Sequence, residues 1–264
     1  LDGATVAAAV AGGKVTLKSD HSLTVESGST VNVSGGVTVS QAGAFAGTAA
    51  GSIVLEGLNA SSLTGQETVK IGGQLQGFSM GKGGSLRIKT GSIVIDGDGT
   101  ALTQSGNTGL TVGGGFFGEG GFQNFDLDGR TSLTLTEGTR ITPTLKVWQA
   151  KAAGRGAATG SDTATFVALD PRTDIVRNAV GIALSSSGTE LGSGKLTLAS
   201  GSLINTGPQA TVALSAGHTI DIDGTVHSMG GTITASVKAG QSDADAGNHI
   251  NLGEHATLDV SGGR

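Results

Sequence analysis

The sequence predicts an all-β fold in which a single chain coils into a parallel β-solenoid, and three observations support this prediction. Short segments of alternating apolar and polar residues recur along the chain, glycine-rich turns separate them, and aromatic residues make up only 3% of the composition. Alternation with period two places every second side chain on one face of a strand. Stacked strands of this kind bury a narrow aliphatic column, which needs no large aromatic rings.

The repeat is clearest over residues 194–262, where six alternating segments follow one another. Their apolar residues form one inward-facing series with spacings of 16, 21 and 17 residues: Leu196, Val212, Ile233 and Ile250. Leu203 and Ile220 form a second, offset series. We therefore expect a coil with turns of about 16–21 residues, and not a succession of hairpins.

Composition supports the same fold class and excludes several others. Glycine accounts for 48 of the 264 residues, more than twice the roughly 7% of average proteins. The glycines follow no three-residue period, which excludes collagen, and the alternating aliphatic residues between them argue against disorder. We expect one β-helix segment over residues 1–264, and the absence of a starting Met and of a leader suggests a piece of a longer repeat protein.

Charge and cysteine content narrow the functional classes. The net charge of −5 is small and spread along the chain, so we expect no nucleic-acid partner. No apolar run approaches the roughly 18 residues of a spanning helix, so we expect no membrane insertion. The lack of cysteine excludes disulfides, thiolate metal sites and a cysteine nucleophile.

The first part of the chain repeats the same pattern. Alternating segments occupy residues 14–17, 22–25 and 30–33, and others follow between 52 and 96. Lys70, Arg87 and Lys89 alternate with apolar residues, so we expect their charges on a solvated outer face. A shift of one residue would bury the polar set, so the strand register is strongly specified.

Residues 113–129 form the first interruption, which we expect to be a Phe/Gly-rich loop. It contains four of the seven phenylalanines: Phe116, Phe117, Phe122 and Phe125. Such a cluster serves either as an exposed contact platform or as a plug that packs against the coil. Packing is favoured, because exposed Phe without Tyr or Trp is a poor carbohydrate surface.

Residues 144–188 form the second interruption, an irregular excursion with Trp148 and Arg155. The apolar residues over 172–184 suit either a helix or one buried strand, and both alternatives stay open. Loops that project from a repeat scaffold commonly carry the binding face. The candidate interaction residues are therefore the four phenylalanines with Trp148 and Arg155.

No constellation of residues predicts catalysis or a bound cofactor. The pairs Asp126/Asp128 and Asp221/Asp223 each place two carboxylates on one strand face, about 7 Å apart, but each pair is followed by Gly, a common turn signal. The five histidines show neither metal-ligand spacing nor a nucleophile partner. We expect no enzyme activity, no catalytic residues, no metal site and no cofactor.

Several segments resemble the repeat body of filamentous haemagglutinin-family exoproteins. These are GFQNFDLDGRTSLTLTEGT over residues 121–139, GKLTLASGSLINT over 194–206, IDIDGTVHSMGGTIT over 220–234 and INLGEHATLDVSG over 250–262. The resemblance covers about 120–264 best. It implies a right-handed parallel β-helix exported through the Gram-negative outer membrane by a partner β-barrel transporter.

The resemblance also implies a function in two-partner secretion systems. It predicts a secreted or cell-surface adhesin, a virulence or biofilm factor, that displays loops on a β-helix stalk toward a host-cell, bacterial-cell or glycan receptor. The family's amino-terminal secretion module and an Arg-Gly-Asp triplet are missing from this sequence. Two other classes stay open: a carbohydrate-active β-helix enzyme, either lyase or hydrolase, and a calcium-stabilised glycan-binding module.

Overall fold

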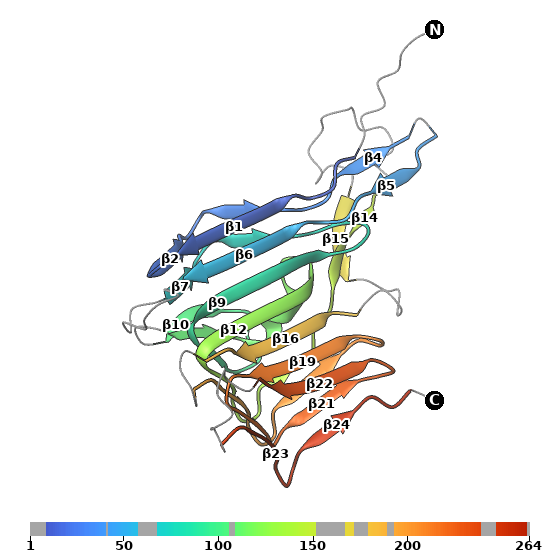
Figure 1. The fold of residues 1–264 in the computed structure, drawn as a ribbon. Coiled ribbons are helices and arrows are strands. Elements are labelled where there is room, and N and C mark those ends of the chain that lie inside the picture. Colours follow the sequence, from blue (N-terminus) through green and yellow to red (C-terminus); the bar gives the residue numbers. More distant parts are fainter. Residues whose placement is uncertain are drawn as a thin grey trace.

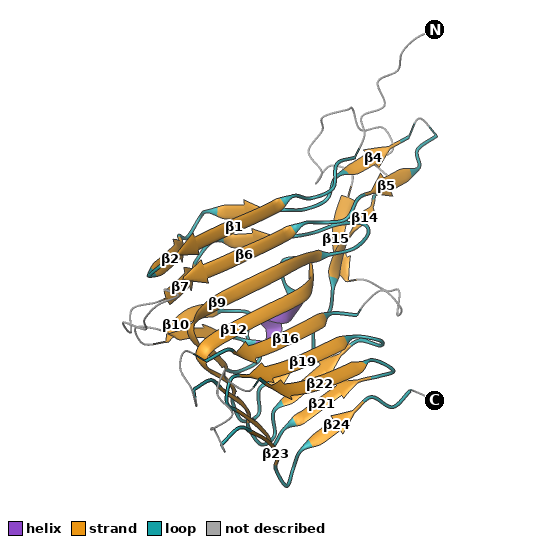
Figure 2. Cartoon of the chain, viewed as in Figure 1, coloured by secondary structure: helices purple, strands orange, loops and turns teal. Residues whose placement is uncertain are grey.

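The protein is all-β in a computed structural model that describes residues 9–40, 42–57, 68–105, 109–151, 167–171, 179–188, 193–238 and 247–262. Figure 2 shows strands throughout, with one short 3₁₀ helix, η1 (Gly114–Gly118), in the interior. Within the described ranges, no helix has the length and apolar character needed to cross a membrane.

One long parallel stack runs through the molecule (Figure 1). Each of its strands pairs in parallel with the next one, which lies 21 or more residues further along the chain. The strands are, in order, β1 (Lys14–Ser19), β6 (Ser52–Gly57), β9 (Gly84–Ile95), β12 (Phe122–Leu135), β16 (Gly181–Ser186), β19 (Thr211–Ala216) and β22 (Thr232–Val237).

Two further sets of parallel strands accompany this stack. The second set contains β2 (Ser22–Val25) paired with β7 (Thr68–Ile71) as a separate sheet. It continues with β11 (Gly109–Val112), the second halves of β9 and β12, β17 (Lys195–Leu198), β20 (Thr219–Ile222) and β23 (His249–Leu252). The third contains two separate sheets, one of β3 (Thr30–Asn32) and β8 (Gln74–Gln76), and one of β13 (Arg140–Ile141), β18 (Leu203–Thr206), β21 (Thr225–Ser228) and β24 (Thr257–Asp259). The chain thus visits three sets of strands in turn, an arrangement compatible with a parallel β-helix.

The spacing between stacked residues corrects the sequence prediction. Equivalent positions in the first stack are Val15, Ile53, Leu86, Phe125, Ile182, Val212 and Ile233. We call the stretch of chain from one of these positions to the next a pass, and successive passes span 38, 33, 39, 57, 30 and 21 residues. Only the last spacing falls within the predicted 16–21. The spacings are longer than predicted because each pass contains strands of three sets. Alternation of apolar residues identifies the inward side chains, but it does not show which strands are neighbours.

The predicted single series over residues 194–262 is wrong for the same reason. Leu196 lies beside Ile220, which lies beside Ile250, in the second set of strands. Val212 lies beside Ile233 in the first stack. The prediction of parallel strands and not hairpins in this region is confirmed.

Inward-facing aliphatic side chains form the core. Ile53, Leu55, Ile88 and Leu127 have no exposed surface, and Leu86 is only 1% exposed. Full burial of such a side chain is worth about 1.5–3 kcal/mol. The core continues along the whole stack as a single cluster from Val25 to Val226.

Residues 113–129 are only partly a loop. The segment starts with η1, which contacts β13, and residues from Phe122 onward belong to β12. Pairing of β12 with β9 shifts register between Phe122 and Asn124 and again between Gly129 and Ser132. These irregularities interrupt the alternation, which explains why the strand was missed in the sequence.

Three antiparallel hairpins complete the described fold. They are β4 (Val37–Val39) with β5 (Phe45–Gly47), β10 (Leu102–Ser105) with β11 (Gly109–Val112), and β14 (Lys146–Ala150) with β15 (Val167–Pro171). The excursion predicted over 144–188 therefore contains the β14–β15 hairpin and then returns to the main stack as β16. Gly181–Ser186 is a strand, and residues 172–178 lie outside the described residues.

Candidate functional site

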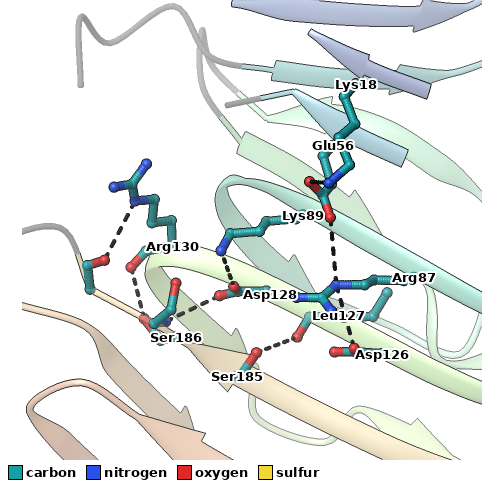
Figure 3. A network of polar contacts seen from close by, with 12 residues as sticks. Lys18, Glu56, Arg87, Lys89, Asp126, Leu127, Asp128, Arg130, Ser185 and Ser186 are labelled. Atoms are coloured by element: carbon teal, nitrogen blue, oxygen red, sulfur yellow. Dashed lines mark hydrogen bonds and ion pairs between the residues drawn. The ribbon is translucent and has the colours of Figure 1, made fainter. Parts of the chain in front are cut away.

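The candidate site lies on the outer face of the first stack, where charged side chains project from four neighbouring strands (Figure 3). On β9, the inward positions of Leu86 and Ile88 leave Arg87 and Lys89 pointing outward. On β12, Leu127 points inward between Asp126 and Asp128. The parallel register then places each acid beside a base of the neighbouring strand.

These side chains form a ladder of alternating charge. The Lys18 Nζ lies 2.8 Å from the Glu56 Oε2, and the Arg87 Nε lies 3.8 Å from the Glu56 Oε1. Arg87 Nε also lies 3.5 Å from the Asp126 Oδ2. A ladder that alternates in sign across parallel strands favours this register over one in which like charges face each other.

Asp128 is the buried end of the ladder. Only 3% of the residue is exposed, its Oδ2 lies 3.1 Å from the Lys89 Nζ, and its Oδ1 accepts a hydrogen bond of 3.1 Å from the Ser187 backbone N–H. The sequence predicted a surface or turn aspartate here, which is wrong, because Asp128 lies within β12 and the following Gly129 is part of the same strand. A buried and paired carboxylate fixes strand position and does not reach a ligand.

Asp126 has the opposite character, because its side chain is 42% exposed. Partial burial raises the pKa of the Asp126 carboxyl above its usual value, the Arg87 charge opposes that rise, and the Asp128 charge adds to it. Among the described residues, no hydrogen bond is donated to this carboxylate. Asp126 is therefore an acceptor that is open to an external donor.

A shallow groove of about 300 Å³ crosses the strands at this point, and we call it the outer groove. Its outward side chains form two columns that run across β6, β9, β12, β16 and β19. One column is Ser52, Ser85, Asn124, Gly181 and Thr211, and the other is Val54, Arg87, Asp126, Ala183 and Ala213. Gly181 and Ala183 are small, which leaves room beside Asp126.

Of the candidate residues chosen from the sequence, Phe125 on β12 borders the outer groove, and Phe116, Phe117 and Phe122 are not part of its lining. Phe116, Phe117, Phe122 and Phe125 are all buried, at 7%, 0%, 2% and 2% exposure. The ring centroids of Phe117 and Phe125 are 5.1 Å apart, and those of Phe116 and Phe125 are 5.7 Å apart. The preference for packing is thus confirmed, and these rings offer no exposed contact platform.

Of the remaining two candidates, Trp148 is not part of the lining of the outer groove. Trp148 on β14 is half-buried, and its ring packs against Phe78 with a centroid distance of 6.3 Å. Arg155 lies outside the described residues. The sequence did contain a signal for the outer groove, because Arg87 and Lys89, and likewise Asp126 and Asp128, alternate with apolar residues. The sequence did not show that these two pairs lie on neighbouring strands.

In the second aspartate pair, Asp221 lies on β20, whereas Asp223 follows the end of that strand, as the turn prediction requires. The Asp223 carboxylate accepts a hydrogen bond of 2.9 Å from the His255 backbone N–H, and the His255 Nδ1 lies 3.3 Å from its other oxygen. These contacts, the backbone one first, lower the pKa of the Asp223 carboxyl. Asp221 instead pairs with Lys195 at 2.8 Å. In the described part of the chain, no three His, Cys, Asp or Glu side chains gather closely enough to hold a metal ion.

The outer groove offers hydrogen-bonding groups, and of the two aspartates Asp126 and Asp128 on β12 only the first is accessible to a ligand. Hydrolysis of a glycosidic bond needs two accessible carboxylates on either side of the bond. Here Asp126 is accessible, whereas Asp128 is buried against Lys89.

Comparison with known proteins finds no matching protein-family model, no matching curated protein and no matching solved structure. The resemblance to filamentous haemagglutinin-family exoproteins therefore stays a prediction from the sequence.

Proposed function

We propose that this chain is a rod segment of a large secreted or surface exoprotein, and that it displays contact surfaces for adhesion on a right-handed parallel β-helix. The observation that supports it best is the uninterrupted first stack, in which seven strands from β1 to β22 each bond to the next. Parallel crossover connections are right-handed in about 98% of cases, which supports the proposed hand.

The energetics of the stack suit a mechanical spacer. Each pass contacts mainly its neighbours, so stability accumulates along the axis as the number of passes grows. With strands about 4.8 Å apart, the seven strands span about 29 Å, so a long stalk requires many such passes. Ion pairs between strands, such as Lys18–Glu56 and Lys89–Asp128, favour the correct register of the strand pairing, and each pair adds no net charge to the stack.

The cellular setting rests on the sequence resemblance. It comprises export by an outer-membrane β-barrel transporter, location at the surface of a Gram-negative bacterium and contact with a cell or glycan receptor. A chain without cysteine suits export in an unfolded form, since no disulfide closes before translocation.

Duplication of one complete pass tests the rod proposal. Residues 211–231 contain β19, β20 and β21, and they end where β22 begins. Four extra copies of this 21-residue pass should lengthen the particle by about 19 Å in small-angle X-ray scattering, with the cross-section unchanged and the thermal stability equal or higher. A variant that unfolds, or that grows equally in all directions, would show that the passes do not stack independently.

Adherence tests the second half of the proposal. Beads coated with the purified protein should bind epithelial or bacterial cells more strongly than beads coated with the heat-denatured protein. Equal binding by the two preparations would contradict an adhesive function, whereas the duplication experiment would still report on the rod.

A carbohydrate-active enzyme is the second candidate, because acidic and basic residues from successive strands meet beside one groove. The burial of Asp128 argues against it. Incubation with neutral and acidic polysaccharides should release neither reducing ends nor unsaturated products, and release of either would favour the enzyme.

A further inference from the structure

The outer groove has hydrogen-bonding groups that the described fold does not use. The Asp126 carboxylate receives no hydrogen bond from described residues, and its nearest charged neighbour is the Arg87 Nε at 3.5 Å. The Arg87 Nε lies 3.8 Å from the Glu56 Oε1 and 3.5 Å from the Asp126 Oδ2, and its guanidinium donates no hydrogen bond to another described residue. Among the described residues, the hydrogen bond found for the Asn124 amide is a long one of 3.5 Å, which it donates to the Ser85 Oγ. The groove therefore offers an acceptor, a donor fork and an amide side by side.

The charge of the groove restricts the ligand. Arg87 lies between two carboxylates, those of Glu56 and Asp126, so the groove carries no excess positive charge for an anion. Asp126 would also repel an acidic ligand. A neutral ligand that both donates and accepts hydrogen bonds complements this mixture.

The shape of the groove indicates a linear ligand. The two columns cross five strands that are about 4.8 Å apart, which gives a trough about 19 Å long. Ser52, Ser85 and Thr211 supply a hydroxyl group from three of those strands, and Val54, Ala183 and Ala213 supply apolar surface on the other side. Such a site presents polar groups at regular steps beside apolar surface, as an oligosaccharide presents hydroxyls beside the apolar faces of its rings.

We propose that the outer groove binds a neutral linear oligosaccharide that lies along the stack axis, with its hydroxyls bonded to Asp126, Arg87 and Asn124. This inference deepens the proposed adhesive function and places the contact surface on the sheet itself, not on a projecting loop. A peptide that adds a strand is excluded at this position, because the strands of the groove already pair with neighbours on both edges.

Two substitutions test the site in different ways. Ala183→Trp fills the groove from its outer side without removing a charge, and Asp126→Asn exchanges one acceptor oxygen for an NH₂ donor and removes the negative charge with little change of shape. Thr197→Trp is the matched control, since Thr197 lies on β17, outside the groove. Circular dichroism and thermal unfolding establish that all three variants fold.

The binding experiment uses cellohexaose, xylohexaose and mannohexaose as neutral probes and hexagalacturonate as an acidic probe of equal length. Amide chemical shifts of the ¹⁵N-labelled protein should move saturably on β9, β12 and β16 with at least one neutral probe. Ala183→Trp and Asp126→Asn should each weaken that binding at least about tenfold, and Thr197→Trp should leave it unchanged.

Three results would overturn the inference. The first is the absence of a saturable shift with every neutral probe up to about 10 mM, a concentration at which a Kd corresponds to only about −3 kcal/mol of binding free energy. The second is binding that Ala183→Trp does not weaken. The third is binding of the acidic probe without binding of any neutral probe. None of these outcomes affects the rod proposal, which the pass-duplication experiment tests separately.

Discussion

Lys89 on β9 and Asp128 on β12 form an ion pair across neighbouring strands, with the Lys89 Nζ 3.1 Å from the Asp128 Oδ2 and only 4% of the Asp128 side chain exposed. The Ser187 backbone N–H, which follows β16, bonds to the other oxygen of the same carboxylate. One carboxylate thus joins three successive passes of the chain at the edge of the core.

Lys89→Met should therefore lower the free energy of unfolding by about 3 kcal/mol, because it leaves a buried carboxylate without its counter-charge. Urea denaturation measures the change. The matched control is Lys18→Met, which removes the exposed partner of Glu56 and should cost at most about 1 kcal/mol. An equal decrease in the free energy of unfolding in the two variants would show that burial of Asp128 does not determine the contribution of the Lys89 ion pair.

Phe117 packs against Phe116 and Phe125 in the aromatic cluster and has no exposed surface. Phe117→Ala should lower the free energy of unfolding by about 3–5 kcal/mol, because it removes the ring and leaves a cavity. The control Phe45→Ala, on the half-buried β4–β5 hairpin, should cost clearly less. A loss at Phe45 as large as that at Phe117 would contradict the plug-like packing of the cluster.

Gly114 starts η1 where the chain passes close to β13. A Cβ at this position would lie 2.0 Å from the Arg140 backbone oxygen, which cannot move without disturbing β13. Gly114→Ala should destabilise the protein by about 1–3 kcal/mol. Gly13→Ala, where a Cβ meets no atom within 4 Å, should change stability by less than about 0.5 kcal/mol. The difference between their thermal midpoints checks this close approach.

Asp126 should titrate above the usual carboxyl pKa of 3.8, since burial disfavours its charged form. Because the pKa is raised, ionisation of Asp126 lowers the free energy of unfolding, and this loss is complete above the folded-state pKa. Protonation of Asp126 removes the loss as the pH falls. Asp126→Asn should then leave the thermal midpoint at pH 7 unchanged or higher. Carboxyl ¹³C NMR measures the pKa, and a midpoint below 3.8 would contradict the prediction.

Asp223 should titrate in the opposite direction, below 3.8, because the His255 N–H stabilises its charged form. A lowered pKa gives a contribution to stability that is complete above the unfolded-state pKa and is lost as the pH falls through the folded-state pKa. The His255 amide resonance should therefore shift below about pH 4. Absence of this shift in the native protein, with Asp223→Asn as the reference, would show that the contact does not persist in solution.

The sequence determined the fold class through the two-residue alternation of its apolar side chains. In β6, for example, alternation alone identifies Ile53 and Leu55 as inward and Val54 as outward, and both inward residues are fully buried. It also indicated that the phenylalanines pack, because exposed Phe without Tyr or Trp is a poor carbohydrate surface.

Only the tertiary structure decided which strands are neighbours, because hairpins and turns of different length separate positions that stack. Leu86 and Phe125 are 39 residues apart, and Val212 and Ile233 are 21 apart, although both pairs occupy the same position in the stack. That register alone brings Arg87 beside Asp126 and buries Asp128 against Lys89. The sequence supplied the charges of the outer groove, and the stacking of distant passes made them into a site.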